Sequence, residues 1–162
     1  MVNRLSLEVK KPEWVDVFKY PKGHLLEKGR RGLYHEAIKA AGKVEWRYGC
    51  YAWATPKSQI RYCGSTSRDY SNVEFKTNLH GRLHNYLQNH GGATNKRVFE
   101  NIRAALISED VFLVHFSFEE LALGGEVLSF EEFSNDRTLA KAVEELLIAS
   151  YRRIGQCDWN MT

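Results

Sequence analysis

Two aromatic-rich runs joined by a turn constrain the fold of this chain more than any other feature. VEWRYGCYAWAT and QIRYCGST are connected by the turn-forming residues Thr55, Pro56, Lys57 and Ser58. Aromatic and β-branched residues favour strands, and a short turn between two such runs is typical of a β-hairpin. The sequence therefore predicts an antiparallel pair of strands over residues 44–66.

The two runs carry the triplets Gly49-Cys50-Tyr51 and Tyr62-Cys63-Gly64, which are nearly mirror images. Because side chains alternate across a strand, Tyr51 and Tyr62 share a face if the strands pair them directly or with an even offset. The spacing permits direct pairing. Trp53 and Ile60 would then join the tyrosine face, and the other face would hold Cys50, Ala52, Arg61 and Cys63. Cross-strand aromatic pairs also stabilise hairpins without any further role.

Helical periodicity and capping residues organise the remainder of the chain. Helices are predicted over 24–42, 78–90, 95–107 and 135–155, and a central strand over 110–118. A chain of 162 residues is long enough for one domain with a real core. We therefore expect a single α/β (α+β layered) domain over 1–162, with helices flanking a small antiparallel central sheet of about three strands and a basic helical leader over 1–44.

Charge is unevenly distributed along the chain. Residues 1–107 carry 19 Lys and Arg against 9 Asp and Glu, a balance of +10, whereas residues 108–162 carry 4 against 11, a balance of −7. A basic segment of this kind suits a polyanionic partner. The residues predicted to contact nucleic acid are Arg30, Arg31, Ser65, Arg68, Lys96 and Arg97.

No apolar run reaches the roughly 20 residues that a bilayer helix needs, and the N-terminus lacks the apolar region of a secretory signal. We therefore expect a cytoplasmic protein without a membrane partner. Cys50, Cys63 and Cys157 are odd in number and lack the paired spacing of a zinc site. They are predicted to be small buried hydrophobic residues.

The two triplets belong to a longer pattern. Arg82 follows them on a predicted helix, Tyr86 comes one turn later, the late segment VEELLI supplies a glutamate, and Asn160 lies near the C-terminus. In this order the residues resemble the signature of the GIY-YIG nuclease family, over the stretch 48–160. Ser65 stands where many members carry lysine, so Lys57 or Lys76 would have to supply one if it is needed.

The resemblance implies an Mg²⁺-dependent endodeoxyribonuclease, with Mn²⁺ as a substitute, acting on double-stranded DNA. The small size favours a site-specific type II restriction endonuclease that works as a homodimer on a palindromic site. A phage or mobile-element nuclease of the same chemistry is the first alternative. A catalytically silent DNA-binding module is the second.

Roles for the matching residues follow from the resemblance and from the needs of phosphodiester hydrolysis. Tyr51 and Tyr62 would bind and deprotonate the attacking water, Arg82 and Tyr86 would hold the scissile phosphate, and Glu144 would carry the metal. Gly49 and Gly64 would lack side chains because backbone and DNA approach closely there.

Two adjacent glutamates compete for the metal, and the helical phase separates them. At 100° per residue the apolar arc of the last helix centres near Val143 and Leu146, and Glu144 lies at its border. Glu145 points away from the arc and can pair with Lys141 four residues earlier. A carboxylate at the edge of the core needs a partner, which favours Glu144 as the metal ligand.

Overall fold

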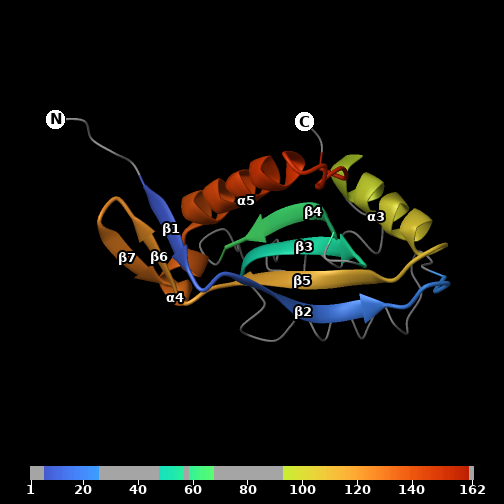
Figure 1. The fold of residues 1–162 in the computed structure, drawn as a ribbon, viewed down its shortest axis with the longest axis horizontal. Helices are drawn as coiled ribbons and strands as arrows, with labels where there is room; N and C mark the ends of the chain where they lie inside the picture. Colours follow the sequence, from blue (N-terminus) through green and yellow to red (C-terminus); the bar gives the residue numbers. More distant parts are fainter. Residues whose placement is uncertain (1–5, 26–47, 57–58, 68–92, 161–162) are drawn as a thin grey trace, which may run out of the picture.

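The computed structural model describes residues 6–25, 48–56, 59–67 and 93–160 (Figure 1). It is a mixed structure of two antiparallel sheets and helices, which confirms the α+β class. The elements are β1 (Leu7–Lys10), β2 (Glu13–Tyr20), β3 (Gly49–Thr55), β4 (Gln59–Thr66), α3 (Ala93–Ala105), β5 (Val111–Ser117), β6 (Glu120–Leu123), β7 (Glu126–Ser129), α4 (Phe130–Asn135) and α5 (Arg137–Arg152).

The larger sheet has the strand order β2-β5-β3-β4, and every neighbouring pair is antiparallel. Its fourth strand, β2, comes from the segment expected to be a helical leader, so the predicted count of about three strands was too low. The predicted leader helix lies almost entirely outside the described residues. None of the described helices is long and apolar enough to cross a membrane.

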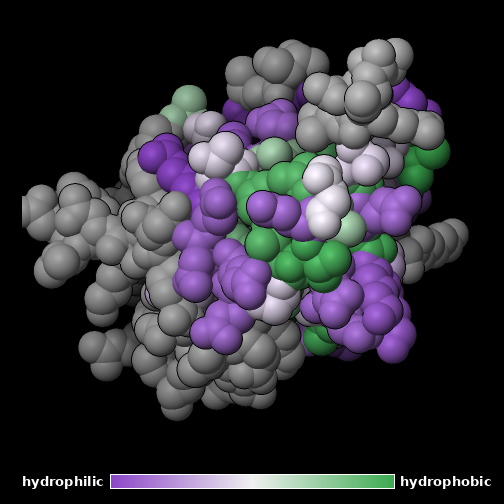
Figure 2. All heavy atoms as spheres, turned by 90° about the vertical axis from the view of Figure 1, so that its left-hand side faces the viewer, coloured by the Kyte–Doolittle hydropathy of each residue, from purple (hydrophilic) through white to green (hydrophobic). Residues whose placement is uncertain are grey.

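The smaller sheet has the order β1-β6-β7 and was not predicted. Gly124 and Gly125 form the turn between β6 and β7 with φ angles of 57° and 94°, a left-handed geometry that glycine adopts readily. Apolar side chains from all three strands pack against the core that Phe118 and Phe133 share with α5. Figure 2 views this end of the molecule, where hydrophobic residues gather among hydrophilic ones.

The β3–β4 hairpin forms as predicted, but its register differs. Tyr51 pairs with Gly64 and Trp53 pairs with Tyr62, an even offset that keeps both tyrosines on one face. The register shifts after Trp53, so Arg61 is an extra residue in β4. Because of this bulge Ile60 packs on the opposite face, with Ala52 and Cys63, and not on the tyrosine face as direct pairing implied.

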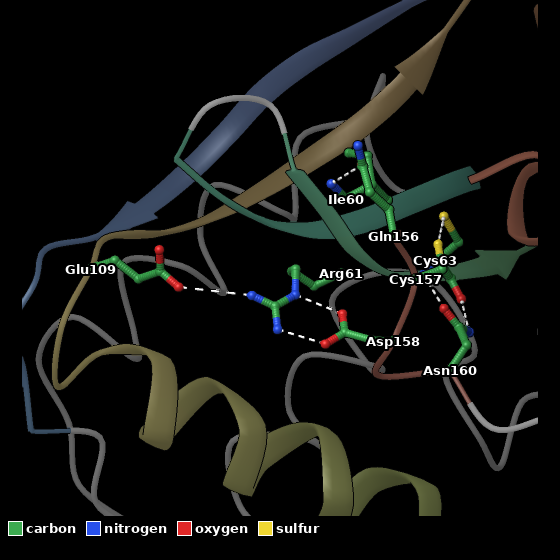
Figure 3. A network of polar contacts seen from close by, with 8 residues as sticks. All are labelled: Ile60, Arg61, Cys63, Glu109, Gln156, Cys157, Asp158 and Asn160. Carbon is green, nitrogen blue, oxygen red and sulfur yellow. Dashed lines mark hydrogen bonds and ion pairs between the residues drawn. The ribbon is translucent and has the colours of Figure 1, made fainter. Parts of the chain in front are cut away.

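The outer edge of β4 is covered by the C-terminal residues (Figure 3). Cys157 N–H donates to the Ile60 carbonyl at 2.8 Å, and Trp159 N–H donates to the Arg61 carbonyl at 2.9 Å. The Asn160 side chain then accepts from the Cys63 N–H and donates to the Cys63 carbonyl, each at 2.9 Å. These bonds satisfy backbone groups that an open sheet edge would expose.

Helix α5 lies over β4 and β3 (Figure 1). It begins after Asp136, whose side chain accepts a hydrogen bond from the Leu139 N–H at 3.1 Å, and lies within the helix predicted over 135–155. Glu144 is 7% exposed while Glu145 is exposed, which confirms the predicted phase for the two glutamates. Leu146 is 53% exposed, so its place in the apolar arc was wrong; the buried apolar residues of α5 are Ala140, Val143 and Ile148.

Candidate functional site

The two tyrosines of the triplets are core residues. Tyr51 is 2% exposed and Tyr62 is 7% exposed, and their ring centroids lie 6.5 Å apart at an angle of 45°. They belong to a cluster with Trp53, with Trp159 and with the buried side chains of α3. The pair is therefore enclosed between the hairpin and a helix.

The glycines of the triplets are explained by contacts within the protein. A Cβ on Gly64 would lie 2.6 Å from both Cζ and Oη of Tyr51, so the absent side chain makes room for that ring. Gly49 has a φ of 105°, and a Cβ there would lie 3.1 Å from Phe130 and 3.3 Å from His115. Close packing of the protein's own aromatic rings thus accounts for both glycines, while the expected close approach of DNA stays a prediction.

Glu144 lies at a pocket between β4 and α5. Its Oε2 accepts a short hydrogen bond from the Ser65 hydroxyl, and its Oε1 lies 2.8 Å from the Lys141 ammonium group. The pocket has a volume of about 190 Å³ and is lined by Ser65, Thr66, Ser67, Arg137, Ala140, Lys141 and Glu144. Its lining therefore includes one carboxylate, two cationic residues and three residues that carry a hydroxyl group.

The tyrosine pair and Glu144 lie on opposite faces of the sheet. Along β4, Tyr62 packs in the cluster with α3, Cys63 packs on the α5 side, Gly64 lies against the Tyr51 ring, and Ser65 bonds to Glu144. This alternation follows from the pleat of the strand. The described residues thus do not bring the predicted water-binding tyrosines and the predicted metal ligand into one pocket.

Lys141 is the partner of Glu144 that the sequence analysis assigned only to Glu145. Its ammonium group lies 2.8 Å from Glu144 and 3.4 Å from Glu145. Partial burial lowers the pKa of Lys141, but the hydrogen bonds and negative charges of both glutamates outweigh burial and leave the pKa above its ordinary value. Lys141 is therefore a persistent cation beside Glu144.

His115 is a buried polar residue that the sequence analysis did not single out. It lies opposite Tyr51 in β5, with Nε2 2.9 Å from the Tyr48 carbonyl and Nδ1 2.9 Å from the Ser117 hydroxyl. A carbonyl only accepts, so Nε2 carries a proton. The signal was present in the sequence: a histidine inside the apolar run VFLVHFSF needs hydrogen-bond partners.

Arg61, the bulge residue, anchors the C-terminal residues to the hairpin. It donates two hydrogen bonds of 2.6 Å to Asp158 (Figure 3). Its guanidinium group lies 5.1 Å from the centre of the Trp159 ring. The hydrogen bonds from Arg61 hold the pKa of Asp158 below its ordinary value, against the effect of burial. Cys63 and Cys157 are buried beside this network with their sulfur atoms 3.6 Å apart, and Cys50 is also buried, as predicted.

The predicted DNA contacts are only partly described. Lys96 is exposed on α3, whereas Arg97 is partly buried and donates to the Trp159 carbonyl at 3.2 Å. Ser65 lies in the Glu144 pocket. Arg30, Arg31, Arg68, Arg82 and Tyr86 lie outside the described residues, as do Lys57 and Lys76.

Within the described residues, no group of three or more His, Cys, Asp and Glu side chains could hold a metal ion. A pocket with one carboxylate is still compatible with Mg²⁺, which usually keeps several waters and shares its shell with substrate phosphates. Glu144 would hold such an ion, with the hydroxyl group of Ser65 beside it.

Comparison with known proteins found no match to this chain among protein families, curated proteins or solved structures.

Proposed function

We propose that this protein is an Mg²⁺-dependent DNA endonuclease of the GIY-YIG type, acting in the cytoplasm on double-stranded DNA. The observation that carries the proposal is the Glu144 pocket, which holds a buried carboxylate, two cationic residues and the hydroxyl group of Ser65, the residue that directly follows Tyr62-Cys63-Gly64. The site-specific type II restriction enzyme, working as a homodimer, is the form that we propose.

The charge around Glu144 suits a phosphate group. All four Lys and Arg residues of the acidic segment 108–162 lie on α5 or directly after it: Arg137, Lys141, Arg152 and Arg153. Arg137 and Lys141 line the pocket itself. Cations and hydroxyl donors at this point would neutralise and orient the oxygens of a phosphodiester.

The chemistry requires a proton acceptor for the attacking water and relief of charge on the leaving oxygen. When bound at Glu144, Mg²⁺ would supply Lewis acidity to the phosphate. Arg82 and Tyr86 are proposed to hold the phosphate. Tyr51 and Tyr62, to which the resemblance assigned the water proton, are buried on the face opposite Glu144, so in the described arrangement they do not share one phosphate with a metal at Glu144.

The second candidate is a catalytically silent DNA-binding module. One observation favours it: both tyrosine rings are buried, and they lie on the face opposite Glu144. In that case the mirrored triplets serve only to pack the hairpin, with Gly64 accommodating the ring of Tyr51.

Plasmid cleavage with and without Mg²⁺ separates the two candidates. We expect Mg²⁺-dependent cleavage by the wild type, no cleavage by Glu144→Gln, and normal cleavage by the matched control Glu145→Gln. Glu145 is exposed, and its ion pair with the same lysine lies at the surface, so the loss of this pair costs a few tenths of a kcal/mol. An inactive wild type, with DNA binding retained, would favour the silent module.

The DNA fragments that the enzyme produces distinguish a restriction endonuclease from a phage or mobile-element nuclease. A site-specific enzyme converts genomic DNA into a discrete set of fragments whose sequenced ends share one motif. A phage or mobile-element nuclease with relaxed specificity would leave ends without such a motif.

A further inference from the structure

Both oxygens of the Glu144 carboxylate already have partners in this structure. Oε2 accepts a hydrogen bond from the hydroxyl group of Ser65, and strand β4 holds Ser65 in place. Oε1 lies 2.8 Å from the ammonium group of Lys141. The Glu144 side chain is 10% exposed, whereas that of Lys141 is 59% exposed. Lys141 can therefore move while Glu144 stays fixed.

We propose that Lys141 competes with a divalent cation for Glu144 and that, once displaced, its ammonium group binds a phosphate oxygen of DNA in the same pocket. Only the second part of this inference, the contact with a DNA phosphate, rests on the proposed function. Competition follows from charge: an ammonium group and a divalent ion repel each other strongly when both lie next to one partly buried carboxylate.

The displaced ammonium group would have to move only a short distance to bind a phosphate in the pocket. Lys141 projects from the α5 turn that also carries Arg137, and both residues line the cavity with Ser65 and Thr66. A lysine has three donors on a flexible stem, so a small rotation exchanges one oxygen partner for another. Its contact with Glu145 at 3.4 Å shows that the group already has more than one partner.

The competition is tested without DNA, by measuring the Mn²⁺ dissociation constant of the full chain calorimetrically. Lys141→Met removes the charge and keeps most of the stem, and we expect it to bind Mn²⁺ about two- to fivefold more tightly, as for the loss of a partly exposed ion pair. Lys141→Arg keeps the charge and should stay near the wild-type value. Unchanged or weaker binding by Lys141→Met would overturn the competition.

Lys19→Met is the matched control for the overall charge. Lys19 lies 3.9 Å from Asp110 on a different part of the molecule, so its loss should leave the Mn²⁺ affinity unchanged. An equal gain in Lys19→Met would mean that net charge, and not the contact with Glu144, sets the affinity. That result too would overturn the competition.

The proposed contact between Lys141 and a DNA phosphate is tested by single-turnover plasmid cleavage at saturating Mg²⁺. Lys141→Met should cleave about tenfold or more slowly although it binds the metal more tightly, and Lys141→Arg should restore most of the rate. Wild-type cleavage by Lys141→Met would refute the phosphate contact. If the wild type itself does not cleave DNA, the proposed function fails, while the Mn²⁺ measurement still decides the competition.

Discussion

Adding one methyl group at Gly64 gives the sharpest test of how the mirrored triplets are built. In Gly64→Ala the new Cβ would lie 2.6 Å from Cζ and Oη of Tyr51 and 2.9 Å from its Cε1. Real carbon atoms do not approach so closely, so the ring or the strand has to shift. Tyr51 is buried in the core cluster with Tyr62, and the ring cannot move without disturbing its neighbours.

The expected cost follows from the packing. Inserting a carbon into a well-packed core costs about 1–3 kcal/mol of unfolding free energy. We therefore expect Gly64→Ala to lose about 2 kcal/mol. For a chain of this length, this corresponds to a melting temperature lower by about 4–8 °C.

Equilibrium unfolding in urea measures the loss, and a double-mutant cycle assigns it. Tyr51→Leu removes all three atoms that the new methyl group would meet, so Gly64→Ala should cost little in that background. The two changes should be coupled by about 1–2 kcal/mol, within the range for residues in contact. If Gly64→Ala costs the same in both backgrounds, the Tyr51 ring is not the reason for glycine at this position.

Three further predictions concern the hairpin and its C-terminal cover. Tyr62→Phe should slow single-turnover DNA cleavage about 10²-fold if the phenol takes a proton, and an unchanged rate would leave only a packing role. Asn160→Ala removes both hydrogen bonds to the Cys63 backbone and should cost about 1–3 kcal/mol in urea unfolding, whereas an unchanged midpoint would contradict a role in closing the edge. Because the folded-state pKa of Asp158 is lowered, its contribution to stability is present above the ordinary aspartate pKa of about 3.9 and is lost as the pH falls further. The melting temperature of Asp158→Asn should therefore fall less than that of the wild type between pH 5 and pH 2.5, and equal losses would refute the linkage.

Local patterns were sufficient for the hairpin and for α5. The turn residues between two aromatic runs predicted β3 and β4, and helical periodicity over 135–155 predicted α5. The same periodicity distinguished Glu144 from Glu145, because burial depends on the angle around the helix axis. These features depend on residues close together in the sequence.

The features that the sequence did not predict depend on contacts between residues that the local pattern does not show. The bulge at Arg61 cannot be predicted from β4 alone, because the partner of the Arg61 side chain, Asp158, lies 97 positions later in the sequence. Strand β2 has a similar register shift, between Asp16 and Phe18, which breaks the alternation that a strand prediction needs. The sequence paired Lys141 with Glu145 because the two residues are four positions apart on a helix. In the structure Lys141 lies closer to Glu144, three positions away, because Ser65 holds the Glu144 carboxylate in place.

The edges of the larger sheet bear on the proposed homodimer. At one edge, the Cys157 and Trp159 N–H groups and the Asn160 side chain already occupy backbone groups of β4. At the other edge, the irregularity in β2 interrupts the regular ladder that a second copy would extend. Both devices disfavour pairing of strands between subunits. A homodimer of this chain is therefore not expected to extend the larger sheet from one subunit to the other, and surface substitutions that leave both edges of that sheet intact should be able to dissociate it.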